Sequence, residues 1–268
     1  ALGVVGGTHG QLLTEALAQE GLPYDFVVVS DETRVASLIV DPARRQVTVI
    51  NEPGAPMSDE TWQALCERVW AHGVAADVVT ISGSLPPGVP VDSWAELLSS
   101  LSKAGVTVYV DTSKDNLRAA LNLEIDLVKA NGYEFSAVLE RKVQTVAEAI
   151  TAAEIALAHG PKNAIVTLGA MGAVAVTQEG TFFAAPPAVD ALCDVGSGDA
   201  LLAGVTVGMV RKWGFAESLH LGVAVAAANT LTLGAGFYAP HHLEEILPQV
   251  RLTRLGRESG LPTPLDFC

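Results

Sequence analysis

The sequence predicts an α/β protein of three layers, with a mainly parallel central sheet between two layers of helices. Strand-like and helix-like segments alternate from about residue 59 to residue 168, and polar or glycine-rich loops follow the strand-like segments. With 268 residues, 49% of them hydrophobic, the chain is long enough to bury a substantial core. We therefore expect one α/β domain over residues 1–250, followed by a loosely ordered C-terminal tail over residues 251–268.

The N-terminal part predicts a strand, a helix and then a small β flap. A strand-like run opens the chain at residues 1–5, and residues 11–20 are amphipathic and end at a glycine, as expected of a helix. Three strand-like runs follow with gaps of hairpin size, at residues 26–30, 34–40 and 46–51. These runs predict an antiparallel flap, or lid, within about residues 26–51.

The middle of the chain predicts repeated helix–strand units. Helices are expected at residues 59–72, 91–104, 114–121 and 146–159, and the strands that follow them at residues 77–82, 107–111, 127–130 and 164–168. This alternation is typical of a parallel sheet with right-handed crossovers. A hairpin is expected at residues 173–177 and 181–184, then two helices at residues 200–210 and 216–233.

Composition excludes several classes of partner. The net charge of -14 repels phosphate backbones, so we expect neither a nucleic-acid nor an anionic membrane partner. No apolar run approaches the length of a membrane span. The three cysteines, Cys66, Cys193 and Cys268, are scattered, which is typical of a reducing compartment. We therefore expect a cytoplasmic protein.

The segment Asp194-Val-Gly-Ser-Gly-Asp199 precedes a long apolar run and predicts an anion-binding turn at a helix start. Glycines allow the backbone to curl, and the amide N–H groups of a helix start attract an anion. Asp199 is placed to take a proton from a hydroxyl group while the amides bind a transferring phosphoryl group. The alternative is a tight loop that ends in an acidic helix cap.

Polar loops also follow four successive predicted strands. Residues 82–88 are suited to lining a polyol site, and residues 111–113, 129–134 and 167–172 offer groups for phosphate and Mg²⁺. Taken singly, each is equally explained as a structural loop or a helix cap. Because the carboxyl ends of parallel strands meet at one edge of a sheet, we expect the four loops to form one site.

The motifs together resemble those of the ribokinase-like superfamily, the phosphofructokinase B family, and within it the branch of 1-phosphofructokinase and tagatose-6-phosphate kinase. The segments that carry the resemblance are Thr33-Arg34, Ile50-Asn-Glu-Pro-Gly54, Ile81-Ser-Gly-Ser-Leu-Pro-Pro-Gly-Val89, Val110-Asp-Thr-Ser113, Lys129-Ala-Asn-Gly-Tyr-Glu134, Val166-Thr-Leu-Gly-Ala-Met-Gly172 and Val195-Gly-Ser-Gly-Asp199. The resemblance implies a ribokinase-like three-layer α/β/α fold with a lid. It also implies an ATP-dependent sugar-phosphate kinase.

The resemblance also implies roles for individual residues. Asp199 is the base, and the amides of Gly196, Ser197 and Gly198 form the anion hole. Asn131 and Glu134 organise Mg²⁺, mainly through water. The nucleotide is bound by Lys129, Asn131, Thr167, Gly169, Gly172, Val223 and Ala227. The sugar phosphate is bound by Arg34, Ser84, Asp111 and Ser113, with the guanidinium of Arg34 reaching the phosphate group. A K⁺ ion is implied near Cys193, Val195, Asn229, Thr232, Gly234 and Gly236.

The implied reaction is transfer of the ATP γ-phosphoryl group to a ketohexose monophosphate, with fructose 1-phosphate as the first choice of acceptor. Tagatose 6-phosphate and fructose 6-phosphate are the alternatives. A homodimer through the lid is expected, because exposed strand edges favour pairing with another chain.

Several positions depart from the family pattern. Cys193-Asp194, Ala130, Ala36 and Lys114 stand where the family favours other residues, and for Lys114 the common residue is glycine. The family's first strand with its aspartate and the Gly-Gly-Lys-Gly-x-Asn segment have no counterpart, so we expect the sequence to start several dozen residues into the pattern. A catalytically silent sugar- or nucleotide-binding fragment of the same fold is therefore the alternative to an active kinase.

Overall fold

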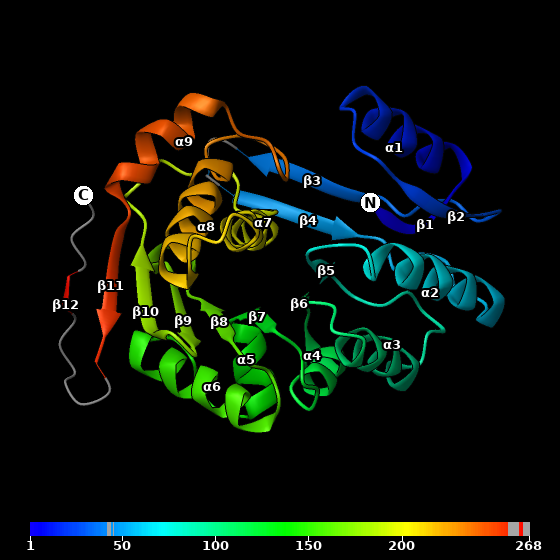
Figure 1. Ribbon diagram of the computed structural model, residues 1–268. Coiled ribbons are helices and arrows are strands. Elements are labelled where there is room, and N and C mark those ends of the chain that lie inside the picture. The colour runs from blue at the N-terminus through cyan, green and yellow to red at the C-terminus, as the bar shows by residue number, and fades with distance from the viewer. Residues whose placement is uncertain (42–43, 45, 257–262, 265–268) are drawn as a thin grey trace. The chain divides into compact units, whose positions relative to one another are not determined.

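An eight-stranded sheet organises the larger of two structural units, which comprises Asp77–Gly83 and Thr107–Cys268 (Figure 1). The computed structural model describes residues 1–41, 44 and 46–256, and the backbone of residues 263 and 264. In order across the sheet, the strands are β12 (Thr263–Pro264), β11 (Arg251–Leu255), β10 (Gly180–Ala185), β9 (Ala173–Thr177), β8 (Ala164–Thr167), β7 (Leu127–Asn131), β6 (Val108–Asp111) and β5 (Val79–Ser82).

The strands β5 to β8 pair in parallel, whereas β8 to β12 pair antiparallel. Strands β6, β7 and β8 are buried along almost their whole length, as expected of parallel strands covered on both faces. Ser82 lies opposite Asp111, Asp111 opposite Lys129, and Asn131 opposite Thr167. The register therefore confirms that the polar loops start from one edge of the sheet.

Helices cover both faces of this sheet, which completes the three predicted layers (Figure 1). On one face lie α7 (Ser197–Val210) and α8 (Phe215–Asn229), with α9 (Pro240–Ile246) packed on α8; on the other lie α4 (Lys114–Ala120), α5 (Gly132–Leu139) and α6 (Val146–His159). Helices α7 and α8 pack backbone to backbone, because a Cβ on Gly204 would lie 2.7 Å from the Cα of Gly222. Leu201, Leu219 and Phe182 bury their side chains in the core under these helices.

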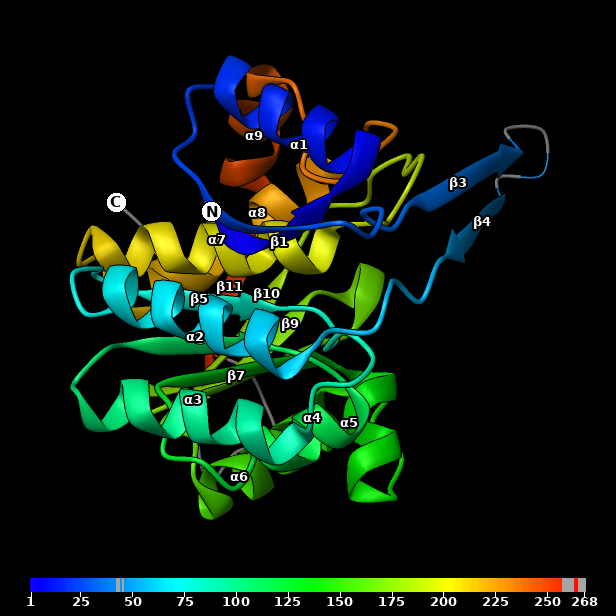
Figure 2. The same cartoon turned by 90° about the vertical axis from the view of Figure 1, so that its right-hand side faces the viewer.

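The smaller unit comprises Ala1–Ala76 and Ser84–Val106. Its strands β1 (Leu2–Gly6) and β2 (Asp25–Val29) pair in parallel and are connected by α1 (Gly7–Gln19). Strands β3 (Ala36–Asp41) and β4 (Gln46–Asn51) form a separate antiparallel ribbon, which extends away from α1 in Figure 2. The unit also contains α2 (Asp59–Gly73) and α3 (Val91–Lys103).

Two expectations from the sequence are wrong, and one open alternative is decided. Residues 26–30 do not join the flap, because α1 returns β2 to β1 as a parallel neighbour, and the flap has only β3 and β4 among the described residues. Residues 251–255 are not a loose tail but the strand β11, which pairs with β10; residues 257–262 and 265–268 lie outside the described part. For residues 129–134, the helix-cap alternative is confirmed, because α5 begins at Gly132 with Asn131 as its cap.

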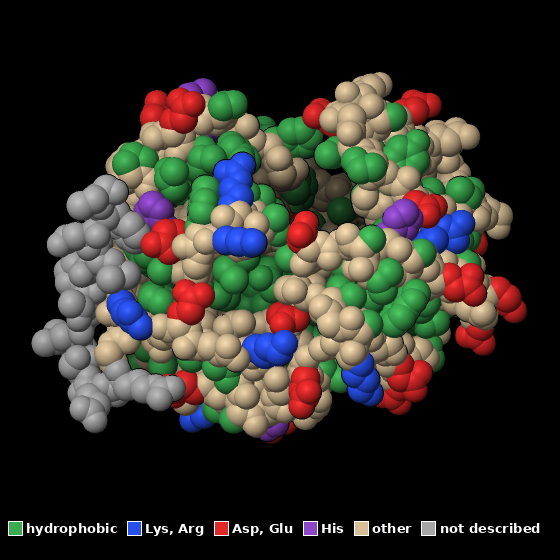
Figure 3. Space-filling model, in the orientation of Figure 1, with side chains coloured by type: hydrophobic (Ala, Val, Ile, Leu, Met, Phe, Trp, Pro, Cys, Tyr) green, Lys and Arg blue, Asp and Glu red, His purple; other side chains and the backbone are tan. Residues whose placement is uncertain are grey.

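The surface fits the strongly acidic composition. On the face shown in Figure 3, acidic and basic side chains are interspersed with uncharged surface. Within the described residues, no helix combines the length and the apolar character that crossing a membrane requires.

Candidate active site

The glycine-rich turn lies directly before α7 and has the backbone that only glycine adopts easily. Gly196 has a φ of +80°, and a Cβ there would lie 2.5 Å from the Cβ of Ala235. No side chain caps the helix. The amide of Ser197 donates to the carbonyl oxygen of Asp194 at 3.1 Å, whereas the amides of Gly196, Gly198 and Asp199 donate to no acceptor in the described part of the chain. The turn therefore offers a cluster of unpaired N–H groups at a positive helix end.

A buried asparagine holds this turn in place. Asn229, at the end of α8, is fully buried and donates through Nδ2 to the carbonyl oxygen of Val195 at 3.0 Å and to Oγ of Ser197 at 3.2 Å. Its Oδ1 accepts from the amide of Gly236 at 2.8 Å. Asn229 thus connects two loops distant in sequence. The resemblance implied that Asn229 lies near a K⁺ ion, but no local pattern predicted its bonds to the turn.

Lys129 and Asp111 form a buried ion pair under the same turn. Nζ of Lys129 lies 2.5 Å from Oδ2 of Asp111, and the two side chains are only 6% and 13% exposed. Burial raises the pKa of the Asp111 carboxyl and the charge on Asp199 adds to the rise, while the ammonium of Lys129 opposes it. A Cβ on Gly198 would lie 2.6 Å from this ammonium, so the lysine side chain lies against the turn. Asp111, expected to bind substrate, is engaged by Lys129.

Asn131 and Glu134 close the start of α5 with a capping box. Oδ1 of Asn131 accepts from the amide of Glu134 at 2.9 Å, and Oε2 of Glu134 accepts from the amide of Asn131 at 2.8 Å. Burial raises the pKa of the Glu134 carboxyl, whereas the hydrogen bond from the backbone amide of Asn131 lowers it and only partly offsets the rise. One carboxylate oxygen of Glu134 is left outside this box.

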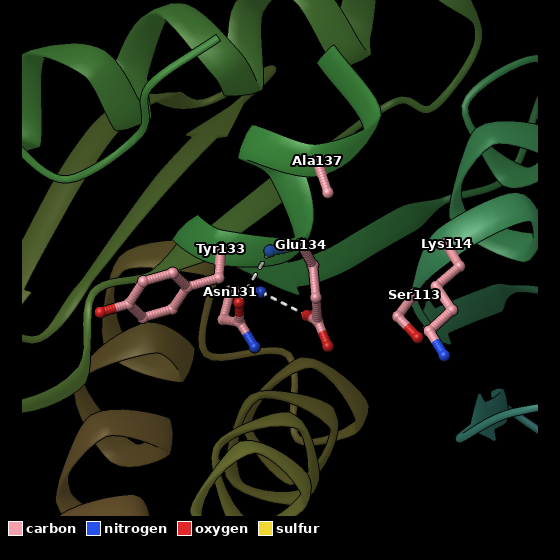
Figure 4. Close-up of a pocket in the computed structure, with 6 residues that line it drawn as sticks. All are labelled: Ser113, Lys114, Asn131, Tyr133, Glu134 and Ala137. Carbon is pink, nitrogen blue, oxygen red and sulfur yellow. Dashed lines mark hydrogen bonds between the residues drawn. The ribbon is translucent and has the colours of Figure 1, made fainter. Parts of the chain in front are cut away.

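A pocket of about 280 Å³ opens beside the capping box (Figure 4). Its lining consists of Ser113, Lys114, Asn131, Tyr133, Glu134 and Ala137. Among the residues that the structure describes, no three His, Cys, Asp or Glu side chains are grouped as a metal site. The donors here, one carboxylate and one amide side chain, suit Mg²⁺ that takes its other ligands from phosphate and water.

The remaining residues expected to bind nucleotide fall into two groups. Thr167 ends β8, and Gly169 has a φ of +60° with open space around it. Gly172 is buried, and a Cβ there would lie 2.0 Å from the carbonyl oxygen of Ala184, so this glycine permits close packing of β10. Val223 and Ala227 are buried in the core and expose little surface to a ligand.

Arg34 and Ser84 lie in the smaller unit. Both are exposed, and Arg34 precedes β3 of the flap. Gly54, with a φ of +79°, lies beside the Arg34 side chain, since a Cβ on this glycine would be 3.5 Å from Cδ of the arginine. The structure thus brings the Asn-Glu-Pro-Gly segment next to the arginine expected to contact the sugar phosphate.

The fold and the site residues define the class of the protein as a ribokinase-like kinase of small molecules. Comparison with protein families narrows the class, because the pattern of the pfkB family carbohydrate kinases matches residues 1–242. The chain belongs to the pfkB family of carbohydrate kinases.

Two relatives and one solved protein show how close the match is. ATP-dependent 6-phosphofructokinase isozyme 2 of Escherichia coli (strain K12) is 33% identical over 231 residues, which are 85% of this chain and 74% of the relative. The 1-phosphofructokinase of Rhodobacter capsulatus is 33% identical over 265 residues, which are 97% of this chain and 80% of the relative. The crystal structure of phosphofructokinase-2 from Escherichia coli in complex with substrates and products has a TM-score of 0.85 at 30% identity, over 93% of this chain and 81% of that one.

The same Escherichia coli enzyme has been solved in two further forms that match. Its complex with potassium has a TM-score of 0.86 at 31% identity, over 93% of this chain and 81% of that one. Its tetrameric inhibited form has a TM-score of 0.81 at 29% identity, with the same coverage. The fold therefore agrees with that of the solved relative in each of these forms.

Proposed function

We propose that the protein transfers the γ-phosphoryl group of ATP to a hydroxyl group of a ketohexose monophosphate, with fructose 1-phosphate as the first choice of acceptor. The observation that carries the proposal is the turn before α7, which combines unpaired amides, an exposed carboxylate at Asp199 and the ammonium of Lys129 beneath it. The 1-phosphofructokinase named above supports the choice of acceptor.

In this reaction Asp199 accepts the proton of the attacking hydroxyl group. Its carboxylate makes no hydrogen bond or ion pair within the described residues, so it is available to a substrate. The amides of the turn bind the negative charge on the transferring phosphoryl group, and they need no reorganisation because Asn229 fixes the turn. Catalysis then depends on positioning and charge stabilisation, as in phosphoryl transfer generally.

We propose that Asn131 and Glu134 hold Mg²⁺ mainly through water, and that Thr167 and Gly169 bind the nucleotide. When bound, the magnesium ion neutralises charge on the phosphates. Lys129 adds a positive charge under the turn, and Asp111 fixes the direction of its ammonium. Arg34, Ser84 and Ser113 are the proposed contacts of the sugar phosphate.

We also propose that K⁺ binds where Asn229 joins the loop at Gly236 to the turn, as the potassium complex of the Escherichia coli relative suggests.

A homodimer through the flap is proposed from the exposed side chains of Ile39, Val49 and Ile50 on β3 and β4, and light scattering tests it. We place the reaction in the cytoplasm, where ATP and sugar phosphates are available.

The first experiment is ADP release by the whole chain with Mg-ATP and fructose 1-phosphate, tagatose 6-phosphate or fructose 6-phosphate. We expect turnover with fructose 1-phosphate and a fall in kcat of about 10³-fold in Asp199→Ala, since the general base is lost. ATP binding is expected to persist in this variant. Asp194→Ala removes another exposed carboxylate, at the first residue of the turn, and keeps the backbone carbonyl that accepts from Ser197; this matched control is expected to keep its activity.

Two results would contradict this proposal. If Asp199→Ala retains most of its activity, the proposed base is wrong. If the wild type binds ATP but turns over none of the three sugars, the chain is a binding protein. Fructose 6-phosphate is the second candidate acceptor, because the 6-phosphofructokinase relative is as similar as the 1-phosphofructokinase relative, and turnover of this sugar alone would establish it.

A further inference from the structure

A lysine with an unusual backbone geometry lines the pocket next to the capping box. Lys114 follows Ser113 at the start of α4 and has a φ of +56°. In this region the Cβ of a side chain crowds the backbone carbonyl oxygen, whereas glycine has no such contact. The local backbone therefore favours glycine at this position, so a lysine here costs some stability.

The ammonium of Lys114 is available to a ligand. The residue is exposed, and within the described residues it forms no ion pair. Lys129, in contrast, is buried and bonded to Asp111. Of the six residues that line the pocket, Lys114 is the one that carries a positive charge.

The other lining residues indicate which ligand would fit. In Figure 4, the side chains of Lys114 and Glu134 extend in the same direction from opposite sides of the pocket, with Ser113 beside the lysine and Asn131 beside the glutamate. A bare anion attracted by Lys114 would be repelled by the carboxylate of Glu134. A polyphosphate with a bound magnesium ion matches both sides, because its metal faces the carboxylate and its oxygens face the ammonium.

We propose that Lys114 binds the outer phosphates of a magnesium-bound nucleoside triphosphate in this pocket. The inference rests on the proposed function, from which it takes the nucleotide as ligand. It adds a phosphate-binding residue at a position where the family commonly has glycine.

The chain contains a matched control for backbone geometry. Lys212, two residues after the end of α7, is also an exposed lysine, with a φ of +60°, and it does not line the pocket. Replacing either lysine by glycine relieves the same backbone crowding, but only Lys114→Gly removes a charge from the pocket. Lys114→Ala removes the charge and keeps the crowding, and Lys114→Arg keeps both.

Binding is measured by calorimetry on the whole chain with Mg-ATP, magnesium tripolyphosphate and adenosine as probes. For Lys114→Gly and Lys114→Ala we expect about tenfold weaker binding of Mg-ATP and tripolyphosphate, from the loss of one charge-assisted contact. Adenosine binding is expected to be unchanged. Lys114→Arg and Lys212→Gly are expected to bind all three probes like the wild type. Both glycine variants are expected to raise Tm by about 2 °C, and Lys114→Ala is not.

Unchanged Mg-ATP binding by Lys114→Gly would overturn the inference, as would a loss of adenosine binding equal to the loss of Mg-ATP binding. A wild type that binds neither Mg-ATP nor tripolyphosphate would overturn it too. Because these measurements need no turnover, they separate the inference from the proposed function. A wild type that binds Mg-ATP without releasing ADP refutes the kinase proposal, and the comparison of the lysine variants still decides the role of Lys114.

Discussion

Helices α7 and α5 both begin at the polar edge of the large sheet, but they treat the N–H groups of their first turns in opposite ways. At α5, the side chains of Asn131 and Glu134 bond to each other's backbone amides. At α7, Gly196 stands in the cap position without a side chain, and the amides of Gly198 and Asp199 find no acceptor in the described part of the chain. The start of α5 is therefore closed by its own side chains, whereas the start of α7 is open.

The difference shows how one fold can use the same kind of helix end for two purposes. A closed end stabilises its helix and fixes the direction of its side chains, here a carboxylate beside a pocket. An open end gives up that stabilisation and keeps its donors for a ligand. The open end must then be held by other parts of the chain, and Asn229 and the Lys129–Asp111 pair are those parts.

The largest effect is expected where the open end loses its backbone geometry. Gly196→Ala forces a Cβ into a left-handed residue and against Ala235. We expect the free energy of unfolding to fall by about 3 kcal/mol, from backbone strain together with overpacking. The kcat is expected to fall by about 10²-fold, because the anion hole moves.

Chemical denaturation and initial rates measure these two effects of Gly196→Ala. The control is Gly105→Ala, where φ is +81° but the space is open, so only the smaller backbone cost is expected. Equal losses of stability in the two variants would show that contact with Ala235 does not hold the turn.

A smaller effect is expected beneath the open end. Asp111→Asn leaves the ammonium of Lys129 buried without its counter-charge, and we expect a loss of about 2 kcal/mol in stability. The loss stays below that of an isolated buried pair because Asp199 and Glu134 also carry negative charge nearby. Denaturation of Asp111→Asn, of Lys129→Met and of the double variant measures the coupling. Additive losses would show that the pair is not a unit.

The contrast between the two helix ends could be predicted from the sequence only in part. The Gly-Ser-Gly-Asp segment before an apolar run predicted the open end, and alternating strands and helices predicted the common edge. For Asn131 and Glu134 the sequence allowed two interpretations, a helix cap or a metal site, because the same spacing suits both. The structure contains the box, and the proposed metal role uses the oxygen left over.

The supports of the open end could not be predicted in the same way. Asp111 and Lys129 meet because β6 and β7 pair in a register that sets them opposite each other, and register depends on the whole sheet. Asn229 bonds to Ser197 across 32 positions of sequence. Likewise, no local signal separated β2 from the flap strands, since the crossover through α1 decides its partner.

The closed end should respond less to loss of its cap. Asn131→Ala removes the side-chain acceptor for the amide of Glu134, and we expect a loss of about 1 kcal/mol in the free energy of unfolding. Asn131→Asp keeps the acceptor and is expected to retain the wild-type helix cap. If Asn131→Ala costs as much as Gly196→Ala, the two ends do not differ in the way described, and denaturation of the three variants settles the order.

The smallest expected effect concerns the charge of Glu134, and its sign depends on pH. Burial raises the pKa of this carboxyl above its ordinary value of 4.5, so the folded chain binds the proton more tightly than the unfolded chain. Ionisation of Glu134 therefore lowers stability as the pH rises through the window between the ordinary and the raised pKa. Glu134→Gln keeps the capping box and does not titrate.

We therefore expect Glu134→Gln to be slightly more stable than the wild type at pH 7 and equally stable below pH 4.5. Denaturation curves at several pH values test this expectation, with Glu148→Gln as control. Glu148 caps α6 in the same way, but its carboxyl has a lowered pKa because it accepts from the amide of Gln144. The control should therefore lose stability at pH 7. If the stability of both variants at pH 7 changes in the same direction relative to the wild type, burial does not distinguish the Glu134 cap from the Glu148 cap.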